Sequence, residues 1–216
     1  MPGALIVAAF DVSPDREEEV LAWHNTEHLP ERLSLNGFLS GRRFVNVEPG
    51  RPRFLIVYEL VSADVVRSPA YLERLNNPTP WTRRSLQAFR HGTRTLVNIS
   101  ARFGARRGDL IALYEAPAQN SIPPCLGRDV HVDRIAWGVS DGGGSSIATE
   151  ESALSRNQVQ ASDLVLIEAG DRQSLTAAAH RLVNGVPALV GKGRFEIQAC
   201  LEAARVNGQT TKTIVH

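Results

Sequence analysis

The chain of 216 residues has only two cysteines, two lysines and no long apolar run, and these shortages exclude several classes of protein. Cys125 and Cys200 lie far apart without a CxxC partner, so we expect both to be reduced and structural. No stretch approaches the roughly 20 apolar residues of a membrane span. The apolar run 4–10 meets Asp11 at once and lacks the flanks of a signal peptide. We therefore expect a cytoplasmic protein that does not bind membranes.

An excess of positive charge is also missing. The sequence has 24 Lys+Arg against 23 Asp+Glu, whereas proteins that bind nucleic acids usually gain affinity from a basic excess. We expect no nucleic-acid partner. Hydrophobic residues make up 43% of the chain, which is enough for a core, and the length suits two domains of about 100 residues each.

The first half has the pattern of a ferredoxin-like unit. Apolar or alternating runs predict strands at 4–10, 38–48, 53–61 and 93–103. Ser13-Pro14-Asp15 predicts the start of a helix that runs to about Leu29, and residues 62–89 are partly helical between prolines. The predicted order is β-α-β-β-α-β.

The second half repeats this order more loosely. Strands are predicted at 109–116, 129–139 and 163–169, and a helix at 174–183; residues 195–206 fit either a strand or a short helix. The glycine-rich residues 141–146 are predicted to form a loop tip. We predict an α+β protein of two tandem ferredoxin-like halves, 1–104 and 105–216, whose antiparallel sheets pack as an α+β barrel.

The first predicted helix carries the polar candidates. Val20 and Leu21 lie three or four residues before His24, which precedes His28 by four, so both imidazoles fall on or beside the inward face. Two histidines at this spacing can hold a metal, but Glu27 is misplaced for HExxH and no third ligand is evident, so we expect none. A purely structural role stays open for both histidines.

His28 is the stronger candidate for proton transfer. Glu27 and Glu31 flank it, and nearby carboxylates favour an imidazolium while burial opposes it. Pro30 predicts that the helix ends or kinks near Leu29, which would place His28 at a helix C-terminus, where the dipole favours its charged form.

The segment WHNTEHLPERLSLNGFLSGRRF, residues 23–44, resembles the signature of the EthD-like branch of the dimeric α+β barrel superfamily. That signature has an aromatic residue, His or Tyr, then Glu-His, a hydrophobic residue and Pro, followed by Gly-Phe and Arg-Arg. PTPWTRR around Trp81 is similar too. The resemblance covers about residues 4–103, and the second half has no equivalent of WHNTEH.

The resemblance implies two four-stranded sheets that pack face to face, usually from two subunits, with the substrate between sheet and helices. Relatives include isomerases, cyclases, cofactor-free monooxygenases and haem-using enzymes, as well as proteins without known activity. His28 maps onto the helical histidine that several members use on their substrate. The second half is then expected to serve as a packing partner, and a homodimer is optional.

We therefore predict a cofactor-independent lyase, isomerase or cyclase that acts on a small ring- or carbonyl-bearing metabolite. His28 would move a proton, while Tyr58 and Arg43 polarise an oxygen. Packing roles for Tyr58 and a surface charge for Arg43 remain alternatives. The substrate-binding candidates are Trp23, His24, Glu27 and Trp81. Two other functions stay open: a non-catalytic protein that binds a ligand or assembles, and a haem enzyme with an axial histidine.

Overall fold

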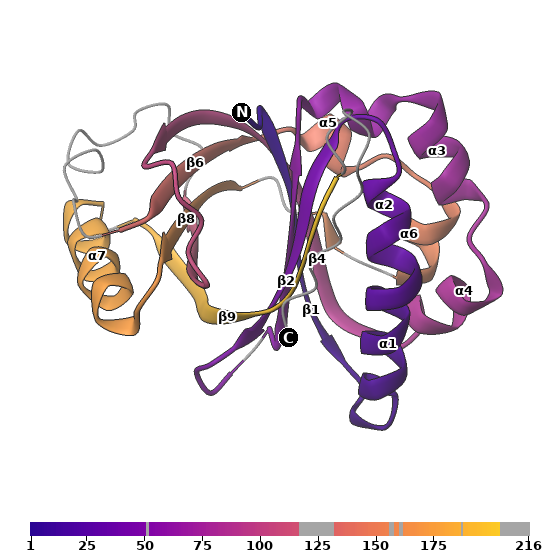
Figure 1. Ribbon diagram of the computed structural model, residues 1–216, viewed down its shortest axis with the longest axis horizontal. Helices are drawn as coiled ribbons and strands as arrows, with labels where there is room; N and C mark the ends of the chain where they lie inside the picture. Colours follow the sequence, from indigo (N-terminus) through magenta and orange to yellow (C-terminus); the bar gives the residue numbers. More distant parts are fainter. Residues whose placement is uncertain (51, 117–131, 156–157, 160–161, 187, 204–216) are drawn as a thin grey trace.

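A closed antiparallel barrel forms the centre of the molecule (Figure 1). The computed structural model describes residues 1–50, 52–116, 132–155, 158–159, 162–186 and 188–203. Within them the strand order is β1-β3-β2-β9-β5-β8-β6-β4, and β4 pairs again with β1. The short β7 (Gln158–Val159) adds to β4 in parallel. The barrel strands are β1 (Ala4–Val12), β2 (Phe38–Asn46), β3 (Phe54–Leu60), β4 (Phe89–Phe103), β5 (Leu110–Ala116), β6 (Arg134–Ser140), β8 (Asp163–Ala169) and β9 (Val190–Glu202).

Helices cover the barrel from two sides. Figure 1 shows one group on the right of the barrel and α7 (Arg172–Gly185) on the left. None of the described helices is long and apolar enough to cross a membrane. The right-hand group comprises η1 (Pro14–Arg16), α1 (Glu17–Trp23), η2 (His24–His28), α2 (Leu29–Leu33), η3 (Ala63–Arg67), α3 (Pro69–Asn76), α4 (Pro80–Leu86), α5 (Gly142–Ser145) and α6 (Glu150–Ser155).

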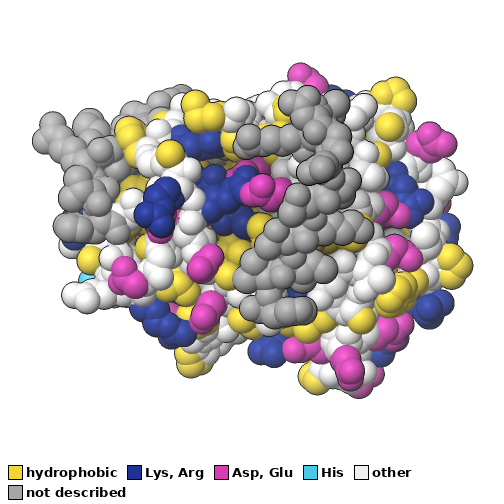
Figure 2. Space-filling view, in the orientation of Figure 1, with side chains coloured by type: hydrophobic (Ala, Val, Ile, Leu, Met, Phe, Trp, Pro, Cys, Tyr) yellow, Lys and Arg dark blue, Asp and Glu magenta, His cyan; other side chains and the backbone are white. Residues whose placement is uncertain are grey.

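Strand alternation separates three apolar clusters. Val7 and Val57 point into the barrel, whereas Ile6, Ile56 and Tyr58 point outward beneath the helices, because successive side chains of a strand lie on opposite faces. A third cluster joins α7 to the outer face of β5 and β8. Acidic and basic side chains are interspersed on the face seen in Figure 2, as the near-zero net charge suggests.

A buried ion network joins the two halves inside the barrel. Arg42 of β2 donates to both oxygens of Glu168 of β8, at 2.9 and 3.0 Å. Arg134 of β6 also donates to Glu168 and lies 2.6 Å from Glu59 of β3. Burial alone would raise the pKa of Glu59, but Arg134 and Arg107 lower it to about 2. Each carboxylate thus has at least one guanidinium partner from the other half of the chain.

The predicted α+β barrel is confirmed, and the structure also shows how the two halves join. The halves meet edge to edge, through β2–β9 and β4–β6, so their two sheets form one closed barrel. Residues 195–202 belong to strand β9. Cys200 is a free thiol, whereas Cys125 lies outside the described residues. The division near Gly104 falls between β4 and β5 and stays a proposal, since strand pairing continues across it.

Two local predictions are wrong. Residues 141–146 are not a loop tip, because α5 forms there and Gly144 and Ser145 are buried against β4. The first helix also does not end near Leu29 as predicted, because it continues past Pro30 to Leu33, while the predicted kink stays a prediction. Immediately before the proline, residues His24–His28 form a π turn in which the amide of Leu29 donates to the carbonyl of His24. In a regular α-helix the ring of Pro30 would clash with the carbonyl of Thr26, four residues earlier. Here that carbonyl lies within the wider π turn.

We expect Glu168→Leu to lower the free energy of unfolding by about 3–5 kcal/mol, because it leaves Arg42 and Arg134 buried without their shared carboxylate. Urea unfolding followed by circular dichroism measures this change. The control is Glu48→Leu, which removes a partly exposed ion pair with Arg194 and should cost less than about 1 kcal/mol. Equal costs for the two variants would show that the network does not stabilise the barrel.

Candidate functional site

A cavity of about 110 Å³ lies between the outer face of the barrel and the helices on the right of Figure 1. Apolar side chains from β1, β3 and α4 form its floor and one wall, among them Ile6, Ile56 and Leu86. The segment that runs through α5 and α6 forms a further wall. The polar lining residues are His24, His28, Arg32, Tyr58, Tyr71, Arg94, Ser145, Thr149, Glu151, Ser152 and Ser155.

Four buried polar atoms on this lining have no hydrogen-bond partner among the described residues. They are Nε2 of His24, Nδ1 of His28, the hydroxyl of Tyr58 and Oε1 of Glu151. Most buried polar groups in proteins are hydrogen-bonded, and leaving one without a partner costs free energy. Their convergence on one largely apolar cavity marks it as the candidate binding site.

His24 is held in one tautomer by Arg43 of β2. Nη1 of Arg43 lies 2.9 Å from Nδ1 of His24 and 2.8 Å from Oδ1 of Asn25. A guanidinium only donates, so Nδ1 accepts and the hydrogen of the neutral ring is on Nε2, the atom without a partner. Burial, followed by the charges of Arg43 and Arg32, lowers the pKa of His24 well below its ordinary value. His24 therefore offers an N–H donor to the cavity.

His28 is also neutral, contrary to the tuning expected from its acidic neighbours. Burial lowers its pKa well below the ordinary value, and Arg32, His24 and Arg74 lower it further. Its ring lies 4.4 Å from the ring of Trp23 and 5.7 Å from that of His24, measured between centroids. Because the helix continues to Leu33, His28 does not lie at a helix C-terminus either. A neutral imidazole here can accept a proton.

The flanking carboxylates are engaged elsewhere. Oε1 of Glu27 accepts from the indole of Trp23 at 3.2 Å, from Thr82 at 2.8 Å and from Thr79 at 2.5 Å, which fastens the helix to α4. Glu27 does not line the cavity, and neither does Trp81, which packs at the edge of the core.

Some of the other predicted site residues line the cavity and others do not. Trp23, His24, His28 and Tyr58 line the cavity. Arg43 does not line it and reaches it only through His24. Burial lowers the pKa of Arg43 to about 10, and burial raises that of Tyr58.

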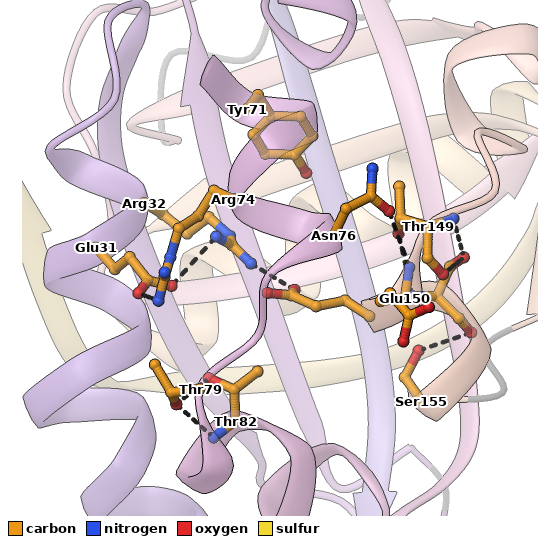
Figure 3. Close-up of polar contacts among 12 residues, drawn as sticks. Glu31, Arg32, Tyr71, Arg74, Asn76, Thr79, Thr82, Thr149, Glu150 and Ser155 are labelled. Carbon is orange, nitrogen blue, oxygen red and sulfur yellow. Dashed lines mark hydrogen bonds and ion pairs between the residues drawn. The ribbon is translucent and has the colours of Figure 1, made fainter. Parts of the chain in front are cut away.

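The second half supplies a wall that sequence reasoning did not find. The segment between β6 and β8 crosses to the first half, and α6 packs against α3 and α4. Glu151 of α6 forms an ion pair with Arg32, and Arg74 of α3 pairs with Glu31 (Figure 3). Thr149 and Ser152 cap the start of α6 with reciprocal hydrogen bonds. That cap is readable in the sequence, but nothing in the sequence shows that the helix lies over the other half.

This cavity, as the described residues form it, suits neither a metal nor a haem. His28, Glu31 and Glu151 place one ligand atom each within 4.8 Å of one another. However, Arg32 already binds both carboxylates and Arg74 binds Glu31, so a cation would displace or face two guanidinium groups. The cavity is also several times too small for a haem, since pockets for drug-sized ligands alone are about 300–1,000 Å³.

Solved structures share this architecture. A putative monooxygenase from Fusobacterium nucleatum subsp. nucleatum has a TM-score of 0.52 at 12% identity, covering 90% of this chain and 91% of that one. An anthrone oxidase-like protein has a TM-score of 0.56 at 9% identity, covering 94% and 93%. A putative chlorite dismutase has a TM-score of 0.50 at 9% identity, covering 90% and 94%. The chain has the α+β barrel fold of these structures. No protein-family profile and no curated protein sequence matches it.

These neighbours correct the functional prediction. The expected lyase, isomerase or cyclase is wrong, because the solved structures that share the fold are named monooxygenases, an anthrone oxidase-like protein and chlorite dismutases. The likeness shows the fold, at identities of 6 to 12%. The residues that line the cavity are therefore the guide to the chemistry of this chain.

We expect the neutral histidines to make stability depend on pH. Both folded-state pKa values are lowered, so the unfolded chain binds protons first as pH falls below about 6.5. The contribution of the two rings to the free energy of unfolding therefore keeps its full value above that pH. It falls as the pH is lowered from there toward the folded-state pKa values, by up to about 1.4 kcal/mol per pH unit for each ring.

Urea unfolding between about pH 5 and 7.5 tests this for the wild type and for His24→Gln/His28→Gln. The double variant should show a flatter rise of unfolding free energy with pH. His180→Gln, on the exposed side of α7, is the control and should keep the wild-type slope. A double variant with an unchanged slope would contradict the neutral state of the two rings.

Proposed function

We propose that the cavity binds a small hydroxyaromatic or enolic compound as its anion, and that the protein oxidises this anion with O₂. The observation that carries the proposal is the combination of neutral imidazoles and unbalanced guanidinium groups around an apolar cavity. Among the described residues, neither Arg43 nor Arg94 has a carboxylate partner. Both therefore leave positive charge beside the site, which favours the ionised form of an acidic hydroxyl.

Size limits the ligand to at most one ring. A cavity of about 150 Å³ binds benzene, and this one, at about 110 Å³, is smaller. Aromatic walls from Trp23, Tyr58, Tyr71 and Phe89 suit a flat molecule. A single hydroxylated ring therefore fits better than the tricyclic anthrone in the name of one structural neighbour.

The chain's own groups suit removal of the proton. Nδ1 of His28 is buried without a partner, and the neutral ring accepts the proton of the ligand hydroxyl. Nε2–H of His24 and the hydroxyl of Tyr58 donate to the oxygen that becomes negative. The wall that α5 and α6 contribute shields one side of the bound anion from water.

The oxidation balances without a further reductant. A phenol and O₂ give a quinone and water: the O–H bond and one ring C–H bond break, one oxygen atom becomes the new carbonyl, and the other leaves as water. The four electrons lost by the ring reduce O₂ completely. Names of oxidative enzymes among the structural neighbours support this class of reaction over a redox-neutral one.

The EthD-like relationship also stays a proposal, supported by the motif around Trp23, His28 and Arg43. The same holds for a small-molecule substrate in a cytoplasmic setting. A second candidate function is binding without turnover, which the apolar cavity alone would support.

An oxygen electrode with phenol, resorcinol and hydroquinone tests the proposed reaction. We expect enzyme-dependent O₂ uptake, and a loss of about 10²–10⁴-fold in His28→Gln, because a positioned base is removed. The thermal midpoint should stay within about 4 °C of the wild type. The exposed His180→Gln serves as the control and should keep full activity.

Two outcomes contradict the proposal. Binding of these phenols without O₂ uptake would favour the non-catalytic candidate. Loss of activity in His28→Gln only in proportion to unfolded protein would give His28 a structural role.

A further inference from the structure

The wall contributed by α6 carries a carboxylate with one unused oxygen. Glu151 is 7% exposed, and its Oε2 accepts from Arg32 across 119 positions of sequence. Its Oε1 is buried and has no partner among the residues that the structure describes. An ionised carboxylate only accepts hydrogen bonds, so Oε1 can be satisfied by a donor on a bound molecule.

Two of the other unpartnered groups are donors, whereas Nδ1 of His28 is the acceptor that takes up the ligand's proton. Nε2 of His24 carries a hydrogen because Nδ1 accepts from Arg43, and the hydroxyl of Tyr58 can donate from β3. A ligand that satisfies these two donors and Glu151 has an acceptor oxygen for His24 and Tyr58 and a separate donor for Glu151. A single phenolic oxygen does not meet both requirements once it has lost its proton.

We propose that Glu151 is a specificity-determining residue that selects rings with a second hydroxyl, which donates to its free oxygen. The proposal rests on the proposed function, since it assumes that the cavity takes a hydroxyaromatic ring. Dihydroxyarenes are then favoured over monophenols. A ring with a carboxylate in the second position is disfavoured, because Glu151 already holds Arg32 and would repel a second negative charge.

Binding measured without O₂ separates recognition from turnover. Phenol, resorcinol and hydroquinone are titrated while tryptophan fluorescence is followed, since Trp23 lines the cavity. We expect the wild type to bind at least one dihydroxyarene about tenfold or more tightly than phenol, as is usual for a hydrogen bond to a charged group.

Glu151→Gln should remove this preference, to within about twofold, while phenol binding persists. The amide oxygen of the glutamine accepts the hydrogen bond from Arg32, so the NH₂ group of the glutamine faces the cavity. The variant should therefore bind 4-methoxyphenol, an acceptor at the second position, more tightly than hydroquinone. Glu150→Gln is the matched control, because the neighbouring Glu150 pairs with Arg83 at the surface and does not line the cavity.

The outcomes are distinguishable. Phenol binding without any preference in the wild type, or a preference that survives Glu151→Gln, overturns the role of Glu151 and leaves the proposed function standing. Failure of the wild type to bind any of these rings overturns both. If Glu151→Gln does not fold, the wild type alone decides, since it must prefer hydroquinone to 4-methoxyphenol.

Discussion

Edge-to-edge pairing of the two halves is the constraint on which the remaining structure depends. β2 pairs with β9 and β4 with β6, so each of the eight described barrel strands has a neighbour on both sides. Inside, Arg42 and Glu168 are buried charges from different halves, each costly to bury without the other. Closure of the barrel fixes the outer face on which the helices pack, and thereby the floor of the cavity.

The cavity itself combines two opposing demands. Its walls are apolar and bury the imidazoles of His24 and His28, which disfavours their charged forms. Guanidinium groups nearby strengthen this effect and at the same time attract negative charge. The site thus favours a neutral base before any proton transfer and attracts negative charge on a bound molecule, and both properties agree with the oxidation proposed above.

Much of the fold could be predicted from the sequence, because strand alternation and helix starts are local signals. The range of β8 matches its predicted run of residues, and α7 lies where its apolar spacing placed it. His28 and Tyr58 could be found as inward residues for the same reason. The roles of Glu27 and Glu151 could not, because both depend on contacts between segments far apart in sequence. The lowered pKa of His28 could not be predicted, because its largest cause is burial, which depends on segments far apart in sequence, and the charge of Arg74 also comes from another helix.

The π turn at His24–His28 has a consequence for how this helix tolerates change in length. A π turn holds one residue more than an α-turn, so in evolutionary terms it is equivalent to a single insertion in a regular helix. In a regular α-helix, residues five apart lie about 140° apart around the axis. The extra residue in the π turn brings Trp23 and His28, which are five apart, onto one face, with their ring centroids 4.4 Å apart. Removing one residue inside the turn would leave the two rings four apart in a regular α-helix, where they would still share a face.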